Sequence, residues 1–386
     1  MLLASSAAVT LVGRSHSPMG TSHEVPVSHR VGHHHDWQNA QVSSEMKIKR
    51  AITSPLTAFV AAALLIGAAA HAETLSKASI DAALKTAYAK YASLHEGNNA
   101  DYIPALANVD PNIYGIVLVT VDGKVYGIGD VATEVSIQSI SKVFTMAKVI
   151  EESGAQALVD NMGVDATGQA FNSIVAIEQH KGAEMNPLVN AGAITATSMV
   201  NGASYADVWN SIIGYYSAFA GRTLSVNQEV YASEAATNQR NQAIAELMYA
   251  YGHIKSNPAQ ATDLYTKQCA VSVNAKDLAV MAATLAAAGR NPLTKQQVLR
   301  ADAVPKVLAV MATAGLYDDS GKWLYDTGLP AKSGVGGGII AVSPGKFGIA
   351  VISPPLDAAG NSVRAQKAIA DISNALGGNP YAVTPR

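Results

Sequence analysis

The sequence predicts a mixed α/β fold of the α+β type, with one antiparallel sheet built from both ends of the chain. Two pairs of β-rich runs carry this prediction, one near residues 116–128 and one near residues 338–353. Between them, residues 155–315 are rich in alanine and mostly helical in pattern. Strands at both ends with helices between them favour a sheet covered by terminal helices, with a helical lobe inserted in the middle.

The amino-terminal elements follow from their residue patterns. Apolar residues recur at helical spacing through residues 74–98, which predicts a helix. Two β-rich runs, Ile116–Val121 and Lys124–Ile128, flank Asp122-Gly123, a pair that favours a hairpin with a type I′ turn. From Ile137 to Glu152 the apolar period becomes helical again.

The carboxy-terminal elements complete the predicted sheet. Gly338–Ser343 and Phe347–Ser353 are apolar runs joined by Ser343-Pro344-Gly345-Lys346, which predicts a second hairpin. Ala275–Ala288 and Ser362–Leu376 have helical patterns. We expect a small ligand to bind in a cleft between the helical lobe and the sheet.

The composition argues against several classes of protein. With 49% hydrophobic and 15% charged residues, the chain can bury a large core and does not resemble a disordered polymer. A net charge of −2 argues against nucleic-acid binding, which depends on neutralising phosphates. The single cysteine, Cys269, excludes an internal disulfide, and we expect it to be a buried small side chain. His95, His180 and His253 lack metal-ligand spacing, so we expect no metal site and no cofactor in the folded domain.

The amino terminus is expected to lie outside the folded domain. Residues 1–45 lack periodic structure and contain six of the ten histidines, and a second possible start follows at Met46. We interpret residues 1–45 as a disordered leader that precedes the true start. A histidine-rich metal-binding tract is the alternative interpretation.

The segment after Met46 predicts export. A basic stretch, MKIKR, precedes the short apolar run Thr57–Ala70 and an A-x-A site that ends at Ala72. This order predicts a cleavable signal peptide over residues 46–72 and a mature domain over residues 73–386. The apolar run is shorter than the ~20 residues of a membrane span, although an uncleaved anchor is the alternative. We therefore expect a periplasmic or secreted protein with no membrane span after processing.

Ser139-Ile140-Ser141-Lys142 is the first candidate for chemistry. If a helix begins near Gln138, then Ser139 and Lys142 share one face of its first turn. A lysine amine whose pKa is lowered by burial can take the serine proton. The free N–H groups at the start of the helix can stabilise an oxyanion. The pattern alone is common by chance, and a capping serine beside a solvated lysine is the plainer interpretation.

A second motif supports the first. Lys332-Ser333-Gly334 is followed by the glycine-rich run Val335–Gly338, just before the carboxy-terminal hairpin. A serine in S-x-x-K together with K-[ST]-G on a later strand is the signature of the penicillin-recognising enzymes. No G-K-[ST] follows the glycines, so a nucleotide-binding loop is excluded. A structural glycine-rich turn is the alternative.

Longer motifs extend this pattern over nearly the whole mature chain. They are IQSISKVF around Ser139, HKGAEMNPLVNAGAI around Asn190, SEAATNQRNQAIA from Ser233, YTKQC around Tyr265 and GLYDDSGKWLYDTGLPAKSGVGGGI from Gly315. With these motifs the chain, over roughly residues 78–378, resembles the serine-dependent glutaminases. The resemblance implies the serine β-lactamase/transpeptidase-like fold. It also implies hydrolysis of L-glutamine to L-glutamate and ammonia without a cofactor, by a homo-oligomer of two or four subunits.

The resemblance also implies roles for individual residues. Ser139 matches the nucleophile, Lys142 its activating base, and Tyr317 a partner in proton transfer. The backbone N–H groups of Ser139 and Val335 match the oxyanion hole. Four positions match the family's glutamine-binding residues: Asn190, Glu234, Asn241 and Tyr265. Tyr102 and Gln138 are expected to be their neighbours in the site.

The residue types agree with such a ligand. Free glutamine carries an ammonium group and a carboxylate on its α-carbon. Glu234 can hold the ammonium group, while the amides of Asn190 and Asn241 and the tyrosine hydroxyls can donate to the carboxylate. Taken singly, each of these residues also has a structural interpretation as a turn, a solvated helix face or part of the core.

Two other functions remain open at the level of sequence. A β-lactamase or D,D-peptidase on the same fold would share S-x-x-K, K-S-G and export, but the residues around Asn190 and Glu234 suit a free amino acid better. A non-catalytic periplasmic amino-acid-binding protein is the second alternative. The presence of both Ser139 and Lys142 argues against it, because binding alone requires neither.

Overall fold

The computed structural model describes residues 75–183 and 185–382. The predicted leader and signal peptide, residues 1–45 and 46–72, fall outside the described residues. Within the described part, no helix is long and apolar enough to cross a membrane.

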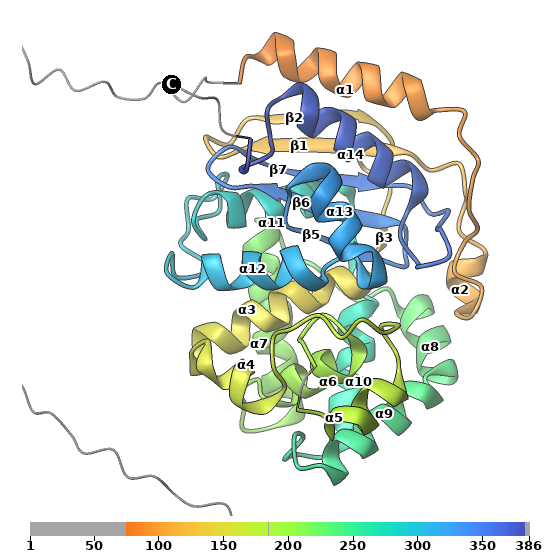
Figure 1. Cartoon of the computed structure of the whole chain (residues 1–386), viewed down its shortest axis with the longest axis vertical. Coiled ribbons are helices and arrows are strands. Elements are labelled where there is room, and N and C mark those ends of the chain that lie inside the picture. The colour runs from red at the N-terminus through yellow and green to blue at the C-terminus, as the bar shows by residue number, and fades with distance from the viewer. Residues whose placement is uncertain (1–74, 184, 383–386) are drawn as a thin grey trace, which may run out of the picture. The chain divides into compact units, whose positions relative to one another are not determined.

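A five-stranded antiparallel sheet forms the centre of the domain (Figure 1). Its strand order is β2-β1-β7-β6-β5, so both ends of the chain contribute to it. The strands are β1 (Gly115–Thr120), β2 (Val125–Gly129), β5 (Ala331–Gly334), β6 (Gly338–Ser343) and β7 (Phe347–Ile352). The predicted sheet built from the two ends of the chain, with both hairpins, is therefore confirmed.

Helices cover both faces of this sheet. On one face, α1 (Lys77–Tyr91) and α14 (Val363–Ala375) enclose a core that includes Ile116 and Leu118. On the other face, α11 (Ala275–Ala286) packs on a core that includes Val117 and Val119. Successive side chains of a strand point to opposite faces, so a strand buried on both faces is a continuous apolar run.

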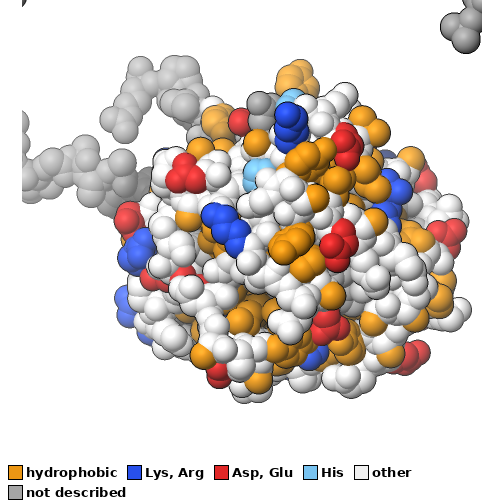
Figure 2. Space-filling model, turned by 90° about the horizontal axis from the view of Figure 1, so that it is seen from below, with side chains coloured by type: hydrophobic (Ala, Val, Ile, Leu, Met, Phe, Trp, Pro, Cys, Tyr) orange, Lys and Arg blue, Asp and Glu red, His pale blue; other side chains and the backbone are white. Residues whose placement is uncertain are grey.

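The middle of the chain forms the helical lobe at the bottom of Figure 1. Its helices are α4 (Gln156–Asn161), α5 (Ile174–His180), α6 (Asn190–Ser198), α7 (Tyr205–Ala220), α8 (Gln228–Thr237), α9 (Gln239–Ala250) and α10 (Pro258–Cys269). α3 (Ser141–Ser153) contacts α12 (Val304–Ala314), which in turn contacts β5. α13 (Ser320–Thr327) contacts α12 and α14, and α2 (Pro104–Ala107) contacts α8. Acidic and basic side chains are interspersed on the face seen in Figure 2.

The first hairpin differs from its prediction in the type of turn. The Thr120 N–H donates to the Lys124 carbonyl at 3.0 Å, so three residues rather than two lie between this last bonded pair. The Gly123 N–H donates to the Thr120 carbonyl at 2.9 Å, and only Gly123 in this turn has a positive φ, +96°. A type I′ turn needs positive φ at both central residues, whereas this geometry is a type I turn followed by a bulged glycine.

The first helix is shorter than predicted. It ends at Tyr91 instead of continuing to residue 98. The chain then turns at Gly97, whose φ is +96°, and the Asn98 N–H donates to the Leu356 carbonyl at 3.0 Å. A Cβ at Gly97 would lie 2.5 Å from that carbonyl oxygen, so pairing with a segment far away in the sequence overrides the local helical pattern.

Candidate active site

Ser139 lies where the sheet, α3 and the helical lobe meet. The short strand β3 (Val135–Ser136) pairs with β4 (Ser272–Val273) and leads into a 3₁₀ turn, Gln138–Ile140, which continues into α3. Gln138 has φ +49°, a conformation that non-glycine residues rarely adopt. Such strain is concentrated at functional sites, so it marks this turn as a candidate site.

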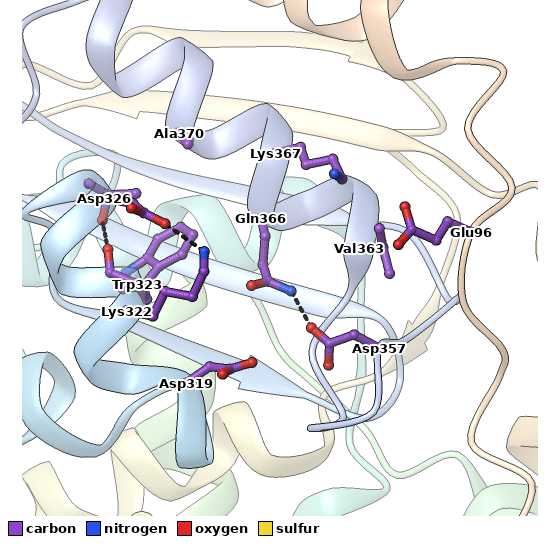
Figure 3. A pocket seen from close by; sticks show the side chains of 11 residues that line it. Glu96, Asp319, Lys322, Trp323, Asp326, Asp357, Val363, Gln366, Lys367 and Ala370 are labelled. Atoms are coloured by element: carbon purple, nitrogen blue, oxygen red, sulfur yellow. Dashed lines mark hydrogen bonds and ion pairs between the residues drawn. The ribbon is translucent and has the colours of Figure 1, made fainter.

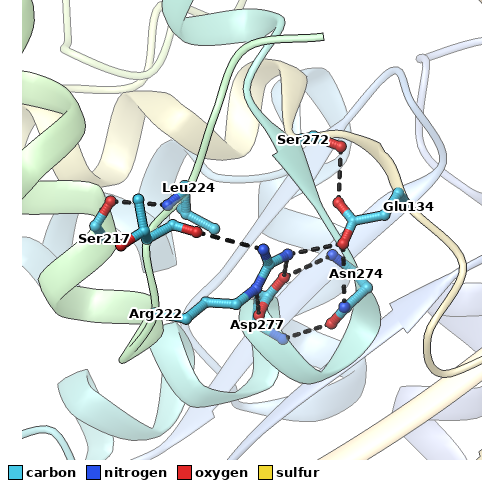
Figure 4. A network of polar contacts seen from close by, with 8 residues as sticks. Glu134, Ser217, Arg222, Leu224, Ser272, Asn274 and Asp277 are labelled. Carbon is cyan, nitrogen blue, oxygen red and sulfur yellow. Dashed lines mark hydrogen bonds and ion pairs between the residues drawn. The ribbon is translucent and has the colours of Figure 1, made fainter.

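A polar network holds the strand that leads to Ser139 (Figure 4). Arg222 donates to Asp277 at 2.7 Å and to Glu134 at 2.8 Å, and Ser272 donates to Glu134 at 2.7 Å. Asp277 also accepts the backbone N–H of Asn274, which completes the capping box of α11. Glu134 directly precedes β3, so the network ties the start of the Ser139 segment to α11 and to Arg222, two residues after the end of α7.

Lys142 lies one helical turn after Ser139 and is completely enclosed. Its side chain donates to Asn190 Oδ1 at 2.7 Å and to the Leu188 carbonyl at 3.3 Å. Burial lowers the pKa of Lys142 to about 8, although Cys269 and Glu234 oppose the shift. The alternative interpretation of Lys142 as a solvated lysine is therefore wrong, and part of the amine is neutral near pH 7 to 8.

Strand β5 passes directly beside the Ser139 turn. A Cβ on Gly334 would lie 2.8 Å from the Ile137 carbonyl oxygen and 3.3 Å from the Ser139 backbone nitrogen. Only a residue without a side chain allows this approach. The next residue, Val335, therefore lies close to Ser139, and both line one cavity.

This cavity has a volume of 260 Å³ and lies between the sheet and the lobe. It brings together eight of the ten residues predicted from the sequence: Tyr102, Gln138, Ser139, Asn190, Glu234, Asn241, Tyr265 and Val335. The other two, Lys142 and Tyr317, do not line it. Lys142 lies behind Asn190, and Tyr317 contacts Ser139 and Phe171, both of which are in the cavity wall.

One end of the cavity is a chain of amides. Asn190 accepts from Lys142 and donates to Asn241 Oδ1 at 2.8 Å, and the Tyr265 hydroxyl donates to Asn190 Oδ1 at 3.3 Å. Asn190 is the first residue of α6, Asn241 lies in α9 and Tyr265 in α10. Three lobe helices thus present neutral polar groups to the same end of the cavity.

Glu234, on α8, supplies the buried negative group. Gln138 donates to its carboxylate at 3.2 Å. Burial raises the pKa of Glu234 to about 7, although Gln138 and Lys142 oppose the shift. Glu234 is 6% exposed and its partner is a neutral amide. A cationic ligand group beside it would lower the pKa of the carboxyl and favour its ionised form.

Tyr317 completes the surroundings of Ser139. Its hydroxyl donates to the Ser333 carbonyl at 3.4 Å and lies close enough to the Ser139 side chain for that side chain to lower the pKa of Tyr317. Burial raises the pKa of Tyr317 to about 12, so its hydroxyl is protonated at neutral pH. Its φ of +54° is a second strained backbone position at the site.

Sequence reasoning missed part of the cavity wall. The additional lining residues are Ile103, Phe171, Asn172, Thr237, Asn238 and Arg240. Arg240 directly precedes Asn241 in the motif SEAATNQRNQAIA, so the sequence offered a reason to include Arg240 among the predicted site residues. Phe171 lies in a segment without a recognised motif, and nothing in the sequence places its ring 4.8 Å from that of Tyr317.

Cys269 and a pocket between α13 and α14 carry no comparable chemistry. The Cys269 side chain is 1% exposed and burial raises the pKa of its thiol, which confirms it as a buried small residue.

The pocket between α13 and α14 has a volume of 300 Å³ (Figure 3). Lys322 pairs with Asp326 at 2.8 Å there, and Gln366 donates to Asp357 at 2.7 Å. Within the described residues, no group of His, Cys, Asp and Glu side chains has the arrangement of a metal site.

The comparisons with known proteins agree with this site. The family model described as Glutaminase matches residues 97–381. A glutaminase of Colwellia psychrerythraea is 52% identical over 302 residues, which cover 78% of this chain and 97% of that one. A glutaminase of Mycobacterium ulcerans is 50% identical over 303 residues, which cover 78% and 95%.

Solved structures give the same result. The structure titled probable glutaminase ybaS is 47% identical with a TM-score of 0.78, and the match covers 80% of this chain and 99% of that one. A probable glutaminase of Bacillus subtilis is 29% identical with a TM-score of 0.70, covering 78% and 96%. The protein thus has the fold of the solved glutaminases, which confirms the predicted β-lactamase-like arrangement. The chain belongs to the glutaminase family.

Proposed function

We propose that this protein hydrolyses L-glutamine to L-glutamate and ammonia through a glutamyl ester on Ser139. One observation carries the proposal: the amine of buried Lys142 lies one helical turn from Ser139, and its two hydrogen-bond acceptors match the two N–H groups of a neutral amine. Asn190 Oδ1 and the Leu188 carbonyl take two N–H donors. A neutral amine has two N–H groups and one lone pair, so the lone pair is left for the serine proton.

The first half of the reaction forms the ester. Lys142 takes the Ser139 hydroxyl proton, and Ser139 Oγ attacks the side-chain carboxamide carbon of glutamine. The backbone N–H groups of Ser139 and Val335 stabilise the tetrahedral oxyanion. When the carbon–nitrogen bond breaks, the proton held by Lys142 passes to the leaving nitrogen, with the Tyr317 hydroxyl as relay beside Ser139, and ammonia departs.

The second half reverses these roles. Water attacks the glutamyl ester and gives its proton to Lys142, and the restored proton returns to Ser139 Oγ as glutamate leaves. Among the described residues, no hydrogen bond joins Lys142 Nζ to Ser139 Oγ, so the proton transfer requires the two side chains to approach each other.

Substrate orientation follows from the charges of the cavity. Glu234 binds the α-ammonium group of glutamine, while Asn241 and Tyr265 donate to its α-carboxylate. Asn190 links this end to Lys142, and Tyr102 and Gln138 border the cavity. The carboxamide then reaches Ser139 and Val335, which line the same cavity.

The decisive experiment is capture of the intermediate. Enzyme quenched during turnover of glutamine is digested and analysed by mass spectrometry, and we expect a glutamyl adduct on the peptide that contains Ser139. Ser139→Ala should fold, lose several orders of magnitude in kcat and show no adduct. An adduct on another residue, or near-full activity of folded Ser139→Ala, would overturn the serine mechanism.

A β-lactamase or D,D-peptidase activity is the competing function. Those substrates carry an acylated amide in place of a free ammonium group, and a buried Glu234 carboxylate would be left without a cationic partner. Ammonia release from glutamine, measured beside hydrolysis of a chromogenic β-lactam, separates the two. Hydrolysis of the β-lactam without ammonia release would overturn the glutaminase assignment.

Processing and assembly are further parts of the proposal. The order of basic, apolar and A-x-A segments in residues 46–72 supports export, with Glu73 as the first residue of a periplasmic or secreted enzyme. The resemblance to the family supports a homo-oligomer of two or four subunits. Amino-terminal sequencing of protein from a periplasmic extract and light scattering of the purified enzyme test these two points.

A further inference from the structure

Lys332 is a buried lysine beside the site, and the proposed reaction does not use it. It lies on β5 with 0% exposure. Its Nζ donates to the Gly315 carbonyl at 2.9 Å and to the Ser333 carbonyl at 2.7 Å. The same nitrogen is 4.1 Å from the centroid of the Tyr317 ring. Two carbonyl oxygens and one ring face therefore surround the amine.

Stability does not explain this residue. No carboxylate of the described chain forms an ion pair with Lys332, and burial, with the charge of Lys142, lowers its pKa well below the ordinary value. Burying an amine without a counterion costs free energy. The two carbonyls also have other donors, because Gly315 O accepts the Ser333 N–H and Ser333 O accepts the Tyr317 hydroxyl. An apolar side chain of equal length would leave neither carbonyl without a partner.

Tyr317 needs support from its surroundings. With φ at +54° its backbone is in a conformation that persists only where neighbouring contacts fix it. The Ser320 hydroxyl donates to the Tyr317 carbonyl at 2.8 Å, and the Phe171 ring packs against the tyrosine ring. Lys332 adds a third contact, because it ties Gly315, two residues before Tyr317, to β5 and also contacts the ring face.

We propose that Lys332 is a positioning residue, which clamps the Gly315 and Ser333 carbonyls and holds the Tyr317 ring so that its hydroxyl stays beside Ser139. The inference rests on the proposed function, because it concerns the proton relay assigned to Tyr317. Displacement of a catalytic group by about 1 Å can cost 100-fold in rate. Loss of Lys332 therefore lowers kcat while glutamine binding at Glu234 and Asn241 is retained.

The first test is Lys332→Met, which keeps the length of the side chain and removes its N–H donors. We expect kcat to fall about 10- to 100-fold while KM changes less than about threefold and the unfolding midpoint is equal or higher. Lys332→Gln keeps one donor group and should recover part of the lost kcat. The control is Lys322→Met on α13, an exposed lysine paired only with Asp326, which should leave kcat unchanged.

The second test is a double-mutant cycle with Tyr317→Phe, which keeps the ring and removes the hydroxyl. If Lys332 acts through that hydroxyl, adding Lys332→Met to Tyr317→Phe should cost less than about threefold more. Independent, multiplying losses would overturn the inference, as would a Lys332→Met protein that fails to fold. In both cases a glutamyl adduct on Ser139 would still support the proposed function, so the two failures are distinguishable.

Discussion

The Gln138 side-chain nitrogen lies 3.2 Å from a carboxylate oxygen of Glu234, and this hydrogen bond joins two walls of the cavity. Gln138 directly precedes Ser139 and also donates to the Ser136 hydroxyl at 3.2 Å. Within the described chain, no lysine, arginine or histidine forms an ion pair with Glu234. The buried carboxylate therefore has only a neutral partner and can accept a cationic group from the ligand, next to the proposed nucleophile.

Glu234→Gln tests this arrangement, because it keeps the size of the side chain and removes the negative charge. A charge-assisted hydrogen bond is worth roughly 1.5–3 kcal/mol, so kcat/KM for glutamine should fall about 10- to 150-fold. Steady-state kinetics on the purified variant measures the effect. Glu246→Gln, an exposed position on α9, is the matched control. Wild-type efficiency in Glu234→Gln would remove this residue from the site.

The dependence of kcat/KM on pH follows from two pKa values of the free enzyme. Lys142 must be neutral to act as a base, so activity should rise with pH through about 8. Glu234 must be ionised to bind the ammonium group, so a second rise should occur through about 7. The slope of log kcat/KM against pH should approach two below pH 7, fall to one between 7 and 8, and reach zero above 8.

Substitution can separate the two rises of kcat/KM with pH, the one assigned to Glu234 and the one assigned to Lys142. Glu234→Gln removes the group that titrates near 7, so its profile should keep only a slope of one, ending near pH 8. A wild-type profile that is flat from pH 6 to 9 would contradict a neutral-lysine mechanism. The measurement requires glutamine concentrations well below KM at every pH.

Only the Ser139–Lys142 pair and the glycine-rich approach could be predicted from local spacing, whereas Asn190, Glu234, Asn241, Tyr265 and Tyr317 followed from the resemblance to the glutaminases. Ser139 and Lys142 are three residues apart, and any helical turn places them together. Gly334 and Val335 form a glycine-rich approach to a strand, a pattern with a clear backbone purpose. In contrast, Lys332 could be recognised as part of K-S-G, but its orientation towards the Tyr317 ring depends on the path of the chain between Gly315 and β5.

The errors have the same physical origin. The first helix ends early because Gly97 and Asn98 contact Leu356, far away in the sequence. The predicted turn type at Asp122-Gly123 is wrong because one additional residue, Val121, belongs to the loop. The number of loop residues depends on the register in which the two strands pair. Patterns of hydrophobicity predict which elements form, whereas their ends depend on contacts with distant segments.

Asn190→Asp tests the coupling between the amide chain and the base. The new carboxylate would lie about where Asn190 Oδ1 now accepts from Lys142 at 2.7 Å, so it should favour the ammonium form. The limb of kcat/KM that ends near pH 8 should move to higher pH by about one unit or more. Asn241 contacts Lys142 only through Asn190, so Asn241→Asp should shift this pH dependence less. Equal shifts, or no shift in Asn190→Asp, would contradict Lys142 as the base.

Gly334→Ala tests the close approach of β5 to the Ser139 turn. The added Cβ would lie 2.8 Å from the Ile137 carbonyl oxygen. Because that oxygen belongs to the backbone and a Cβ has no rotamer that avoids it, the strand must move away from the turn. Overpacking of this kind commonly costs about 1–3 kcal/mol of stability. The displacement also moves the Val335 N–H from the proposed oxyanion position, where loss of one donor costs about 100- to 1,000-fold in kcat.

The matched control is Gly214→Ala in α7, where a Cβ would meet nothing within 4 Å and φ is not in the left-handed region. Alanine is favoured over glycine within a helix by up to about 1 kcal/mol, so this variant should be at least as stable as wild type and fully active. Thermal unfolding and kcat are measured for both variants. If Gly334→Ala kept wild-type kcat in a folded protein, Val335 would have no part in stabilising the oxyanion, and Ser139 would have to find its second donor elsewhere.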